Sequence, residues 1–518
     1  MNAHPLRKKT LWLCACMIAA VNSFAQNSIT FDTAESKTVI SKNIYGHFAE
    51  HLGRCIYDGF YVGEGNKTIP NTNGIRNDIV KALKKLKIPN LRWPGGCFAD
   101  TYHWKDGIGP KDKRASIVNT NWGDVTEDNS FGTHDFLNLC ELLETEPYIS
   151  GNVGTGTVQE MVDWMQYTNF DTKSPMSDLR RQNGRDKAWK VKYWGIGNET
   201  YGCGGHMRVE YYADLYRQYA SFMSNDGKNH LSFVAAGAKN DDYHWTETLM
   251  KDVPLYLLDG IAMHHYSYVD WEEKGAAAKF DEGQYFKTMK QAVWMEELVA
   301  RHSAIMDKYD PKKKVALVVD EWGGWYDVEP NTNPGFLFQQ NTMRDAMIAG
   351  VTLNVFNNHA DRVRMANLAQ CVNVLQAVIL TDKEKMILTP TYHVMEMFAV
   401  HQNARLLPVS VKTNSYTFGA DKLPAVSASA SIDSNQLTHI SLVNIDARKT
   451  QQVTIELKDK KGKTITGRIL TSKQMQDCNT FETPEAIKPA VFREFSVKGE
   501  TLQLKIPAFS VVVLEMVN

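Results

Sequence analysis

The sequence predicts an α/β protein: a (β/α)8 barrel followed by an antiparallel β-sandwich of jelly-roll type. Short apolar runs alternate with helix-length amphipathic stretches from about residue 43 to residue 400, which is the pattern of strand and helix repeats in a barrel. After about residue 401, the segments alternate apolar with polar residues, as half-buried strands do. The length of 518 residues also favours a large domain joined to a smaller one.

The N-terminal residues predict an export signal. Basic side chains at 7–9 precede an apolar stretch at 11–21, and Ser23-Phe24-Ala25 offers small residues for cleavage before Gln26. We therefore expect a signal peptide over residues 1–25 and a mature protein in the periplasm or outside the cell. A lipoprotein, lipidated at Cys14 or Cys16, remains open as a minor alternative. The apolar stretch is too short to span a bilayer, so no membrane insertion is expected.

Residues 26–42 form an N-terminal segment whose stretch 28–31 could add an edge strand to the sandwich. The barrel is expected over residues 43–400, where helical spacing such as Tyr212, Leu215, Tyr219 and Phe222 separates the strand-like runs. No Gly-x-Gly-x-x-Gly follows the first run, which counts against a dinucleotide-binding fold. The eight runs are residues 44–48, 88–93, 148–153, 191–196, 231–236, 260–264, 315–319 and 351–356.

The sandwich is expected over residues 401–518, with strands at 437–443, 452–457 and 502–506. No long linker separates it from the barrel, so the two domains should pack rigidly. A formal net charge of −1 gives no electrostatic reason to expect a nucleic-acid partner. The six cysteines beyond residue 25 have no CxxC spacing, and the pattern does not identify disulfide pairs.

Two glutamates, Glu199 and Glu321, close the apolar runs 191–199 and 315–321. A carboxylate at the C-terminal end of a barrel strand points into the mouth where chemistry takes place. Two such groups suit the cleavage of a glycosidic bond, one as proton donor and one as nucleophile or base. Trp322 and Trp325 follow the second glutamate, and indole rings stack well on the apolar faces of sugars, although Trp322 could equally pack in the core.

Several motifs then resemble family 51 of the glycoside hydrolases, the α-L-arabinofuranosidases. They are YGHFAEHLGR at 45–54, RWPGG at 92–96, WKDGIGP at 104–110, GNE at 197–199, DEW at 320–322 and NLAQCVN at 367–373. They occur in family order and span the barrel. The resemblance implies a retaining exo-glycosidase that removes terminal α-L-arabinofuranosyl groups from arabinan, arabinoxylan or their oligosaccharides. It implies no metal and no organic cofactor, and relatives of this architecture tend to form homo-oligomers.

The resemblance makes Glu199 the acid/base and Glu321 the nucleophile. A retaining enzyme needs its two carboxyl groups about 5–5.5 Å apart. Because the acid must keep its proton near neutral pH, we expect the charge of Glu321 to raise the pKa of Glu199.

The resemblance also implies eight positions around the sugar. Asn198 should bind the 2-hydroxyl, and Tyr266 should support the nucleophile. Cys97 stands where many relatives have an asparagine, and a thiol is a weak donor, so sugar contacts there should be altered. Glu50 and Arg92 should hold ring hydroxyls or orient the carboxylates, Trp122 and Trp325 should form the walls of the pocket, and the role of Gln370 is open. The eight positions are Glu50, Arg92, Cys97, Trp122, Asn198, Tyr266, Trp325 and Gln370.

Alternatives remain beside this interpretation. Another specificity of retaining barrel enzymes, a β-xylosidase or an endo-glucanase, would use the same two glutamates. A non-catalytic glycan-binding protein is a less favoured hypothesis from a different class. His47 and His51 flank Glu50, but their order is not that of a zinc motif, so no metal site is expected. His264-His265 is read as a hydrogen-bonded pair at a strand end.

Overall fold

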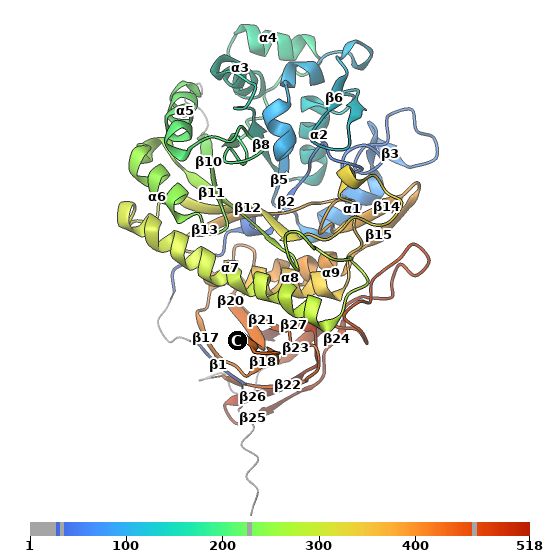
Figure 1. Cartoon of the computed structure of the whole chain (residues 1–518), viewed down its shortest axis with the longest axis vertical. Helices are drawn as coiled ribbons and strands as arrows, with labels where there is room; N and C mark the ends of the chain where they lie inside the picture. The colour runs from blue at the N-terminus through green and yellow to red at the C-terminus, as the bar shows by residue number, and fades with distance from the viewer. Residues whose placement is uncertain (1–26, 32–35, 225–229, 458–463, 518) are drawn as a thin grey trace, which may run out of the picture.

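The computed structural model describes residues 27–31, 36–224, 230–457 and 464–517 (Figure 1). The predicted signal peptide, residues 1–25, lies outside these ranges. A barrel with its surrounding helices occupies one end of the molecule and a β-sandwich the other (Figure 1). Within the described ranges, no helix combines the length and the apolar character that a membrane span requires.

Eight parallel strands form the closed barrel, which confirms the predicted fold class. The ring closes where Asn367 and Leu368 of the last strand pair with Gly46 and His47 of the first. In chain order, the strands are β2 (Gly46–Phe48), β5 (Asn90–Trp93), β8 (Glu146–Gly151), β9 (Tyr193–Ile196), β10 (Ser232–Lys239), β11 (Gly260–Ser267), β12 (Ala316–Gly324) and β13 (Val363–Leu368).

Most helices around the barrel are amphipathic, and six of them, α3, α4, α6, α7, α8 and α9, begin at a capping side chain. In α5, for example, Tyr212, Tyr216 and Tyr219 are buried while the opposite face is exposed. The helix α7 begins after Asp281, whose side chain accepts a hydrogen bond from the backbone of Gln284. The helices are α1 (Asn77–Leu86), α2 (Thr133–Leu143), α3 (Val158–Asn169), α4 (Pro175–Gln182), α5 (Val209–Phe222), α6 (Tyr243–Asp252), α7 (Glu282–Tyr309), α8 (Met343–Asn358) and α9 (Pro390–Phe398).

The sandwich consists of two sheets. One has the order β17 (Val409–Lys412), β1 (Asn27–Phe31), β22 (Gln451–Glu456), β26 (Thr501–Ile506) and β25 (Phe495–Lys498). The other has the order β16 (Arg405–Leu406), β20 (Val426–Ile432), β21 (Leu437–Asn444), β27 (Ser510–Val517), β23 (Ile465–Leu470) and β24 (Ala490–Val491). The strand β1 is parallel to β22 and lies inside its sheet rather than at an edge.

The prediction of a strand at Val351–Phe356 is wrong, because these residues lie in α8. Every residue from Met343 to Asn357 is buried, since α8 packs against α7, α9 and β12 and also against β20, β21 and β27 of the sandwich. A helix that is buried on all sides has no polar face, so its sequence shows a continuous apolar run instead of a helical period. The eighth barrel strand is β13, which follows α8.

Four short two-stranded sheets complete the described fold, each within a segment that connects elements of the barrel or of the sandwich. They are β3 (Asn71–Thr72) with β4 (Ile75–Arg76), β6 (Ile117–Asn119) with β7 (Val125–Glu127), β14 (Ile379–Asp382) with β15 (Lys385–Leu388), and β18 (Ser415–Phe418) with β19 (Asp421–Pro424).

Candidate active site

A β-bulge near the end of β12 turns two adjacent carboxylates toward the barrel mouth. Val318 pairs with Ala262 and Glu321 with His264, so β12 holds one residue more than β11 between these pairs. The pairing with β13 shifts at the same place. In a regular strand, Asp320 and Glu321 would point to opposite faces, and a bulge re-aims one of them.

Glu199 lies three residues beyond the end of β9, on a loop with left-handed backbone. Its φ is +40° and that of Gly197 is +82°, and a left-handed non-glycine residue is strained unless its surroundings hold it. The buried carboxylate of Asp100 supplies such support, because it accepts hydrogen bonds from the backbone of Asn198 at 3.0 Å and of Val153 at 2.8 Å. Burial raises the pKa of Asp100 to about 7.

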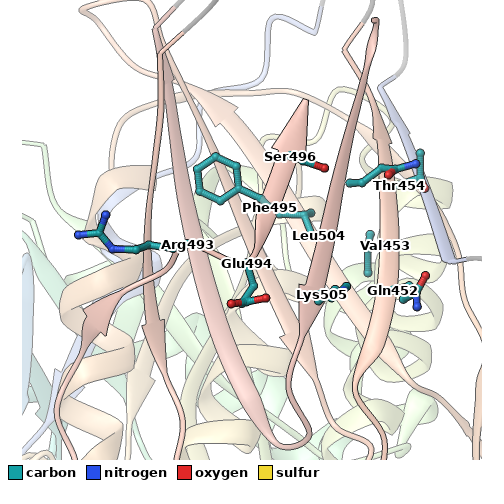
Figure 2. A pocket seen from close by; sticks show the side chains of 10 residues that line it. Gln452, Val453, Thr454, Arg493, Glu494, Phe495, Ser496, Leu504 and Lys505 are labelled. Atoms are coloured by element: carbon teal, nitrogen blue, oxygen red, sulfur yellow. The ribbon is translucent and has the colours of Figure 1, made fainter. Parts of the chain in front are cut away.

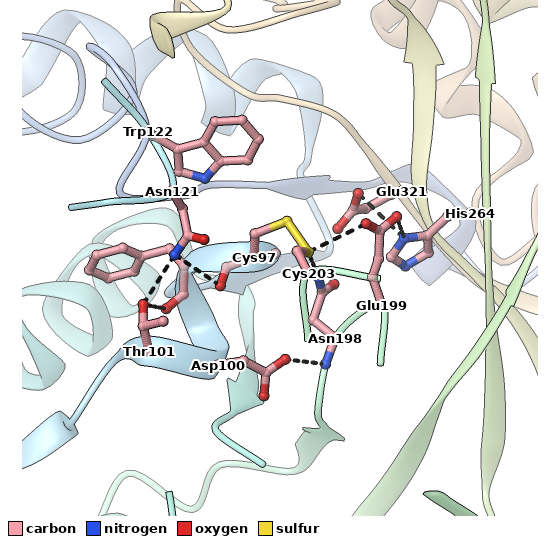
Figure 3. The surroundings of a disulfide bond; sticks show 12 residues. Cys97, Asp100, Thr101, Asn121, Trp122, Asn198, Glu199, Cys203, His264 and Glu321 are labelled. Atoms are coloured by element: carbon pink, nitrogen blue, oxygen red, sulfur yellow. Dashed lines mark hydrogen bonds and ion pairs between the residues drawn. A yellow bond between two sulfur atoms is a disulfide. The ribbon is translucent and has the colours of Figure 1, made fainter. Parts of the chain in front are cut away.

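His264 bridges the two catalytic candidates. Its Nδ1 lies 3.0 Å from Oε1 of Glu199 and 3.4 Å from Oε2 of Glu321, and its Nε2 lies 3.1 Å from Oδ1 of Asp320. One oxygen of Glu199 and one of Glu321 come within 4.8 Å of each other. Figure 3 shows the two glutamates and the imidazole converging on one point.

The charges around His264 fix the protonation of the site. Burial alone would lower the pKa of His264, but Glu321, Asp320 and Glu199 together raise it to about 10. Burial would raise the pKa of Glu199, yet the hydrogen bond and the charge of His264, with a hydrogen bond from Tyr201, hold it below its ordinary value. The expected rise in the pKa of Glu199 is therefore wrong for the ligand-free site, because a cation stands between the two carboxylates.

Arg92 orients the side chains of Glu321 and Asn198 from beneath the site. It is fully buried on β5, and its Nη1 donates to Oε1 of Glu321 at 2.8 Å. Its Nη2 donates to Oδ1 of Asn198 at 2.6 Å, and its Nε donates to Oγ of Ser150 at 3.2 Å. The hydroxyl of Tyr266 donates to the other oxygen of Glu321 at 3.0 Å. The nucleophile candidate is thus fixed at both oxygens.

Glu50 is the centre of a second hydrogen-bonded group. Its Oε1 accepts from the indole of Trp122 at 2.8 Å and from the backbone of Gly96 at 3.0 Å, and its Oε2 accepts from Nε2 of Gln370 at 2.7 Å. Burial, followed by the charge of Glu321, raises the pKa of Glu50 to about 7. A Cβ on Gly96 would lie only 2.7 Å from Oε1 of Glu321, so this position requires glycine.

A disulfide joins Cys97 to Cys203 across 106 residues and forms one side of the site (Figure 3). Sγ of Cys203 lies 3.6 Å from Oε2 of Glu199. The expectation of a weak thiol donor at Cys97 is therefore wrong, because a disulfide sulfur carries no proton to donate. Among the residues that the structure describes, four other cysteines keep free thiols: Cys55, Cys140, Cys371 and Cys478.

All the predicted site residues fall in one connected group. Trp325 packs edge-on against Tyr266 with their ring centroids 5.1 Å apart, which places it beside the nucleophile candidate. Sequence reasoning missed the roles of His264, Asp320 and Tyr201, whose hydroxyl donates to Oε1 of Glu199 at 2.7 Å. The position of His264 at the end of an apolar run could have identified it as a residue of the barrel mouth. The hydrogen bond from Tyr201 to Glu199 could not have been predicted, because it depends on the conformation of the loop after β9.

The bridged triad is also the place where a metal ion could be imagined. Glu199, His264 and Glu321 each offer a ligand atom within 4.8 Å of the others. In this structure, however, both ring nitrogens of His264 already face carboxylates, Nδ1 toward Glu199 and Nε2 toward Asp320. A metal ion would have to displace the ring protons that the raised pKa of His264 favours, so this triad suits a proton better than a metal.

A separate groove of about 280 Å³ lies on the sandwich, along β22, β26 and β25 (Figure 2). Its lining includes Arg493, Lys505 and Phe495, with Glu494 as the single carboxylate. One carboxylate cannot supply an acid and a nucleophile, so this groove is not a second site of the same chemistry.

A closed (β/α)8 barrel with two close carboxylates at its mouth defines a barrel glycoside hydrolase. Two family models match the chain: the α-L-arabinofuranosidase 1 domain over residues 82–282 and the α-L-arabinofuranosidase C-terminal domain over residues 320–510. A relative from Bacteroides ovatus, named intracellular exo-α-L-arabinofuranosidase, is 51% identical and covers 99% of this chain and 100% of its own. The chain belongs to family 51 of the glycoside hydrolases, the α-L-arabinofuranosidases.

Solved structures agree with this assignment. The family 51 arabinofuranosidase from Xanthomonas axonopodis pv. citri is 46% identical, with a TM-score of 0.93 over 95% of this chain and 100% of that one. The α-L-arabinofuranosidase from Thermotoga maritima, solved as an arabinose complex, is 32% identical, with a TM-score of 0.84 over 95% of this chain and 99% of that one.

The expectation of export is contradicted. The Bacteroides ovatus relative, which matches over essentially the full length of both chains, is named as an intracellular enzyme. This finding overturns the assignment of the mature protein to the periplasm or the cell exterior. The residues on which that assignment depended, 1–25, lie outside the described ranges.

Proposed function

We propose that this chain is a retaining exo-α-L-arabinofuranosidase in which Glu321 is the nucleophile and Glu199 the acid/base. The observation that carries the proposal is the approach of the two carboxylates, whose nearest oxygens lie within 4.8 Å. Retaining enzymes hold their carboxyl groups about 5–5.5 Å apart, whereas inverting enzymes need about 6.5–9.5 Å to admit a water molecule.

In the first step, Glu321 attacks the anomeric carbon and forms a glycosyl-enzyme ester while the bond to the leaving oxygen breaks. Arg92 and Tyr266 hold the attacking carboxylate at its two oxygens. The leaving oxygen takes a proton from Glu199. Because the pKa of His264 is raised to about 10, we infer that in the resting site this proton is held at Nδ1 of His264, 3.0 Å from Oε1 of Glu199, so the pair acts as one proton reservoir.

In the second step, Glu199 removes a proton from water, and the resulting hydroxide attacks the anomeric carbon. The ester bond breaks, arabinose leaves with its original anomeric configuration, and Glu321 is again a carboxylate. The proton on Glu199 returns to His264, whose pKa is raised by the restored charge.

The sugar-binding residues follow from the groups left open by the protein's own contacts. Oδ1 of Asn198 is occupied by Arg92, whereas its Nδ2 makes only a long contact of 3.9 Å with Sγ of Cys203, so Nδ2 is the group available for a 2-hydroxyl. Trp122 and Trp325 wall the furanose. Gln370 donates a hydrogen bond to Glu50 through its Nε2. Oε2 of Glu50 can still accept a hydrogen bond from a ring hydroxyl, and the amide of Gln370 can still donate one to a ring hydroxyl. Cys97 contributes only the apolar surface of its disulfide.

We also propose an intracellular place of action, which the name of the Bacteroides ovatus relative supports. Short arabinose-containing oligosaccharides, rather than whole polymers, are then the substrates, because a polysaccharide does not enter a cell intact. A catalytic domain over residues 43–400, a sandwich domain over 401–518 and self-association of the chain remain predictions.

Hydrolysis of 4-nitrophenyl α-L-arabinofuranoside by the full chain tests the function. We expect release of nitrophenol, its loss in Glu321→Gln, and α-arabinose as the first product anomer in proton NMR. Cleavage of the β-xyloside instead, or β-arabinose as the first product, would refute the proposed specificity or mechanism. Sugar binding without turnover by the folded wild type would point to a binding protein.

A further inference from the structure

The pocket wall continues outward from Trp325 to a second tryptophan that carries two lysines. The rings of Trp325 and Trp271 have centroids 5.7 Å apart, and Trp271 is 42% exposed. Nζ of Lys239 lies 4.5 Å from the centroid of the Trp271 ring, and Nζ of Lys274 lies 4.3 Å from it. Lys274 also donates to the backbone oxygen of Trp271 at 2.8 Å. The indole thus holds both ammonium groups in place by cation–π attraction.

This group lies on the side of the site from which the leaving group departs. Lys239 is the last residue of β10 and pairs in register with His264, whose Nδ1 contacts Glu199 at 3.0 Å. The charge of Lys239 is one of those that lower the pKa of Glu199. Because the acid/base protonates the leaving oxygen, cations beside it and outside the furanose wall face the next sugar of the substrate.

Neither ammonium group lies within ion-pair distance of a carboxylate in the described part of the chain, although the charge of Lys239 acts on Glu199 from farther away. The contacts of Lys239 and Lys274 are with Trp271, although Asp270, Glu272 and Glu273 stand in the loop that carries Lys274. Asp270 instead accepts a hydrogen bond from the backbone of Glu272. Two like charges held against one ring repel each other, and the negative charge of a bound carboxylate would offset that repulsion.

We propose that Lys239 and Lys274, held on Trp271, form a leaving-group subsite for an acidic sugar, a uronate adjacent to the scissile arabinofuranoside. The proposal rests on the proposed function, since it assumes that Glu199 faces the leaving group. Each ammonium group can donate to the carboxylate, and Trp271 keeps the two donors at the rim of the pocket. The subsite adds selectivity among arabinose-bearing oligosaccharides without changing the bond that is cleaved.

A matched substrate pair tests the subsite. One substrate is an arabinofuranosyl oligosaccharide whose leaving sugar is a uronate, and the other is its carboxyl-reduced, neutral counterpart. The full chain should show a kcat/KM about tenfold higher on the acidic substrate, as expected for two partly exposed ion pairs, and this ratio should fall as salt screens the charges. In Lys274→Met, which keeps one of the two ion pairs, the ratio should fall to about threefold, and in the double variant Lys239→Met/Lys274→Met it should approach one.

Lys251→Met provides the control, because this lysine is exposed at the end of α6, away from the mouth. It should keep the wild-type ratio. Equal kcat/KM on the two substrates, or an unchanged ratio in the double variant, would overturn the subsite. Hydrolysis of the aryl arabinofuranoside by the same wild-type preparation tests the proposed function separately. A preparation that hydrolyses it but shows no preference for the acidic substrate would refute the subsite and leave the proposed function intact.

Discussion

Removal of Glu199, the proposed acid/base, should affect substrates according to how much their leaving group needs a proton. In Glu199→Ala, the sugar leaving group must depart as an alkoxide, whereas 4-nitrophenolate is stable without protonation. A positioned general acid contributes about 10²–10⁴-fold. The side chain of Glu199 is 24% exposed, so water can partly replace it, and the lower part of that range applies. We expect kcat/KM on an arabino-oligosaccharide to fall about 10²–10³-fold, which is about 3–4 kcal/mol.

The assay compares kcat/KM on the two substrates, because this quantity reports the formation of the glycosyl-enzyme. On the aryl arabinofuranoside it should change by less than about fivefold, while kcat falls because the base for the second step is also missing. Azide should then restore turnover of Glu199→Ala by attacking the ester in place of water. Exposed Glu210 on α5 gives the control variant Glu210→Ala, which should match the wild type.

Equal losses of kcat/KM on both substrates would refute the acid role of Glu199. The fold should tolerate the substitution, because His264 keeps Glu321 at 3.4 Å and Asp320 at 3.1 Å as partners. A thermal unfolding scan of Glu199→Ala beside Glu210→Ala separates loss of chemistry from loss of structure.

Three further predictions concern the groups around the carboxylates. Gly96→Ala should slow turnover at least tenfold, because its methyl group would lie 2.7 Å from Oε1 of Glu321. The control Gly65→Ala, where nothing lies within 4 Å of the added methyl, should keep the wild-type rate. Equal activities of the two variants would contradict this crowding. The pKa of His264 is raised from 6.5 to about 10, so its charge stabilises the fold fully below pH 6.5, and that contribution is lost as the pH rises to about 10. Urea unfolding should therefore show His264→Gln destabilised by at most about 4–5 kcal/mol at pH 6 and little at pH 10. A difference in unfolding free energy that does not change with pH would refute this linkage. Reduction with dithiothreitol should lower the unfolding free energy of the wild type by about 2–4 kcal/mol. It should leave the unfolding free energy of Cys97→Ser/Cys203→Ser unchanged. A double variant that is still destabilised by reduction would show that a disulfide other than Cys97–Cys203 is responsible.

The sequence was sufficient to predict the barrel and the position of the two glutamates at its mouth, because both depend on local patterns. Apolar runs of strand length that end in Glu199 and Glu321 identify strand ends without knowledge of the neighbours. The pattern failed at Val351–Phe356, where α8 is covered by the barrel on one side and the sandwich on the other. Burial on all sides is a tertiary property, and it erases the helical period on which the prediction depended.

The fine geometry of the site could not be predicted, because it depends on irregular backbone. Strand alternation would place Asp320 opposite Glu321, and only the extra residue of the bulge in β12 brings both to His264. The pairing of Cys97 with Cys203 joins loops that follow β5 and β9, and no spacing rule connects them. The predicted pKa of Glu199 was wrong for the same reason, since it considered two carboxylates without the imidazole between them.

His264 gives the site a proton whose affinity changes with the state of the nucleophile. The charge of Glu321 is the largest of the influences that raise the pKa of His264, and esterification of Glu321 removes that charge. The imidazolium should therefore become more acidic as the glycosyl-enzyme forms, when a proton is needed at the leaving oxygen. It should regain its affinity when hydrolysis restores the carboxylate and a proton arrives from water. A glycosyl-enzyme trapped with a slow-turnover 2-fluoro arabinofuranoside should show a lower pKa of His264 by imidazole NMR than the free enzyme. An unchanged pKa would mean that Asp320 and Glu199 alone hold the proton, and that His264 serves only to position the acid/base.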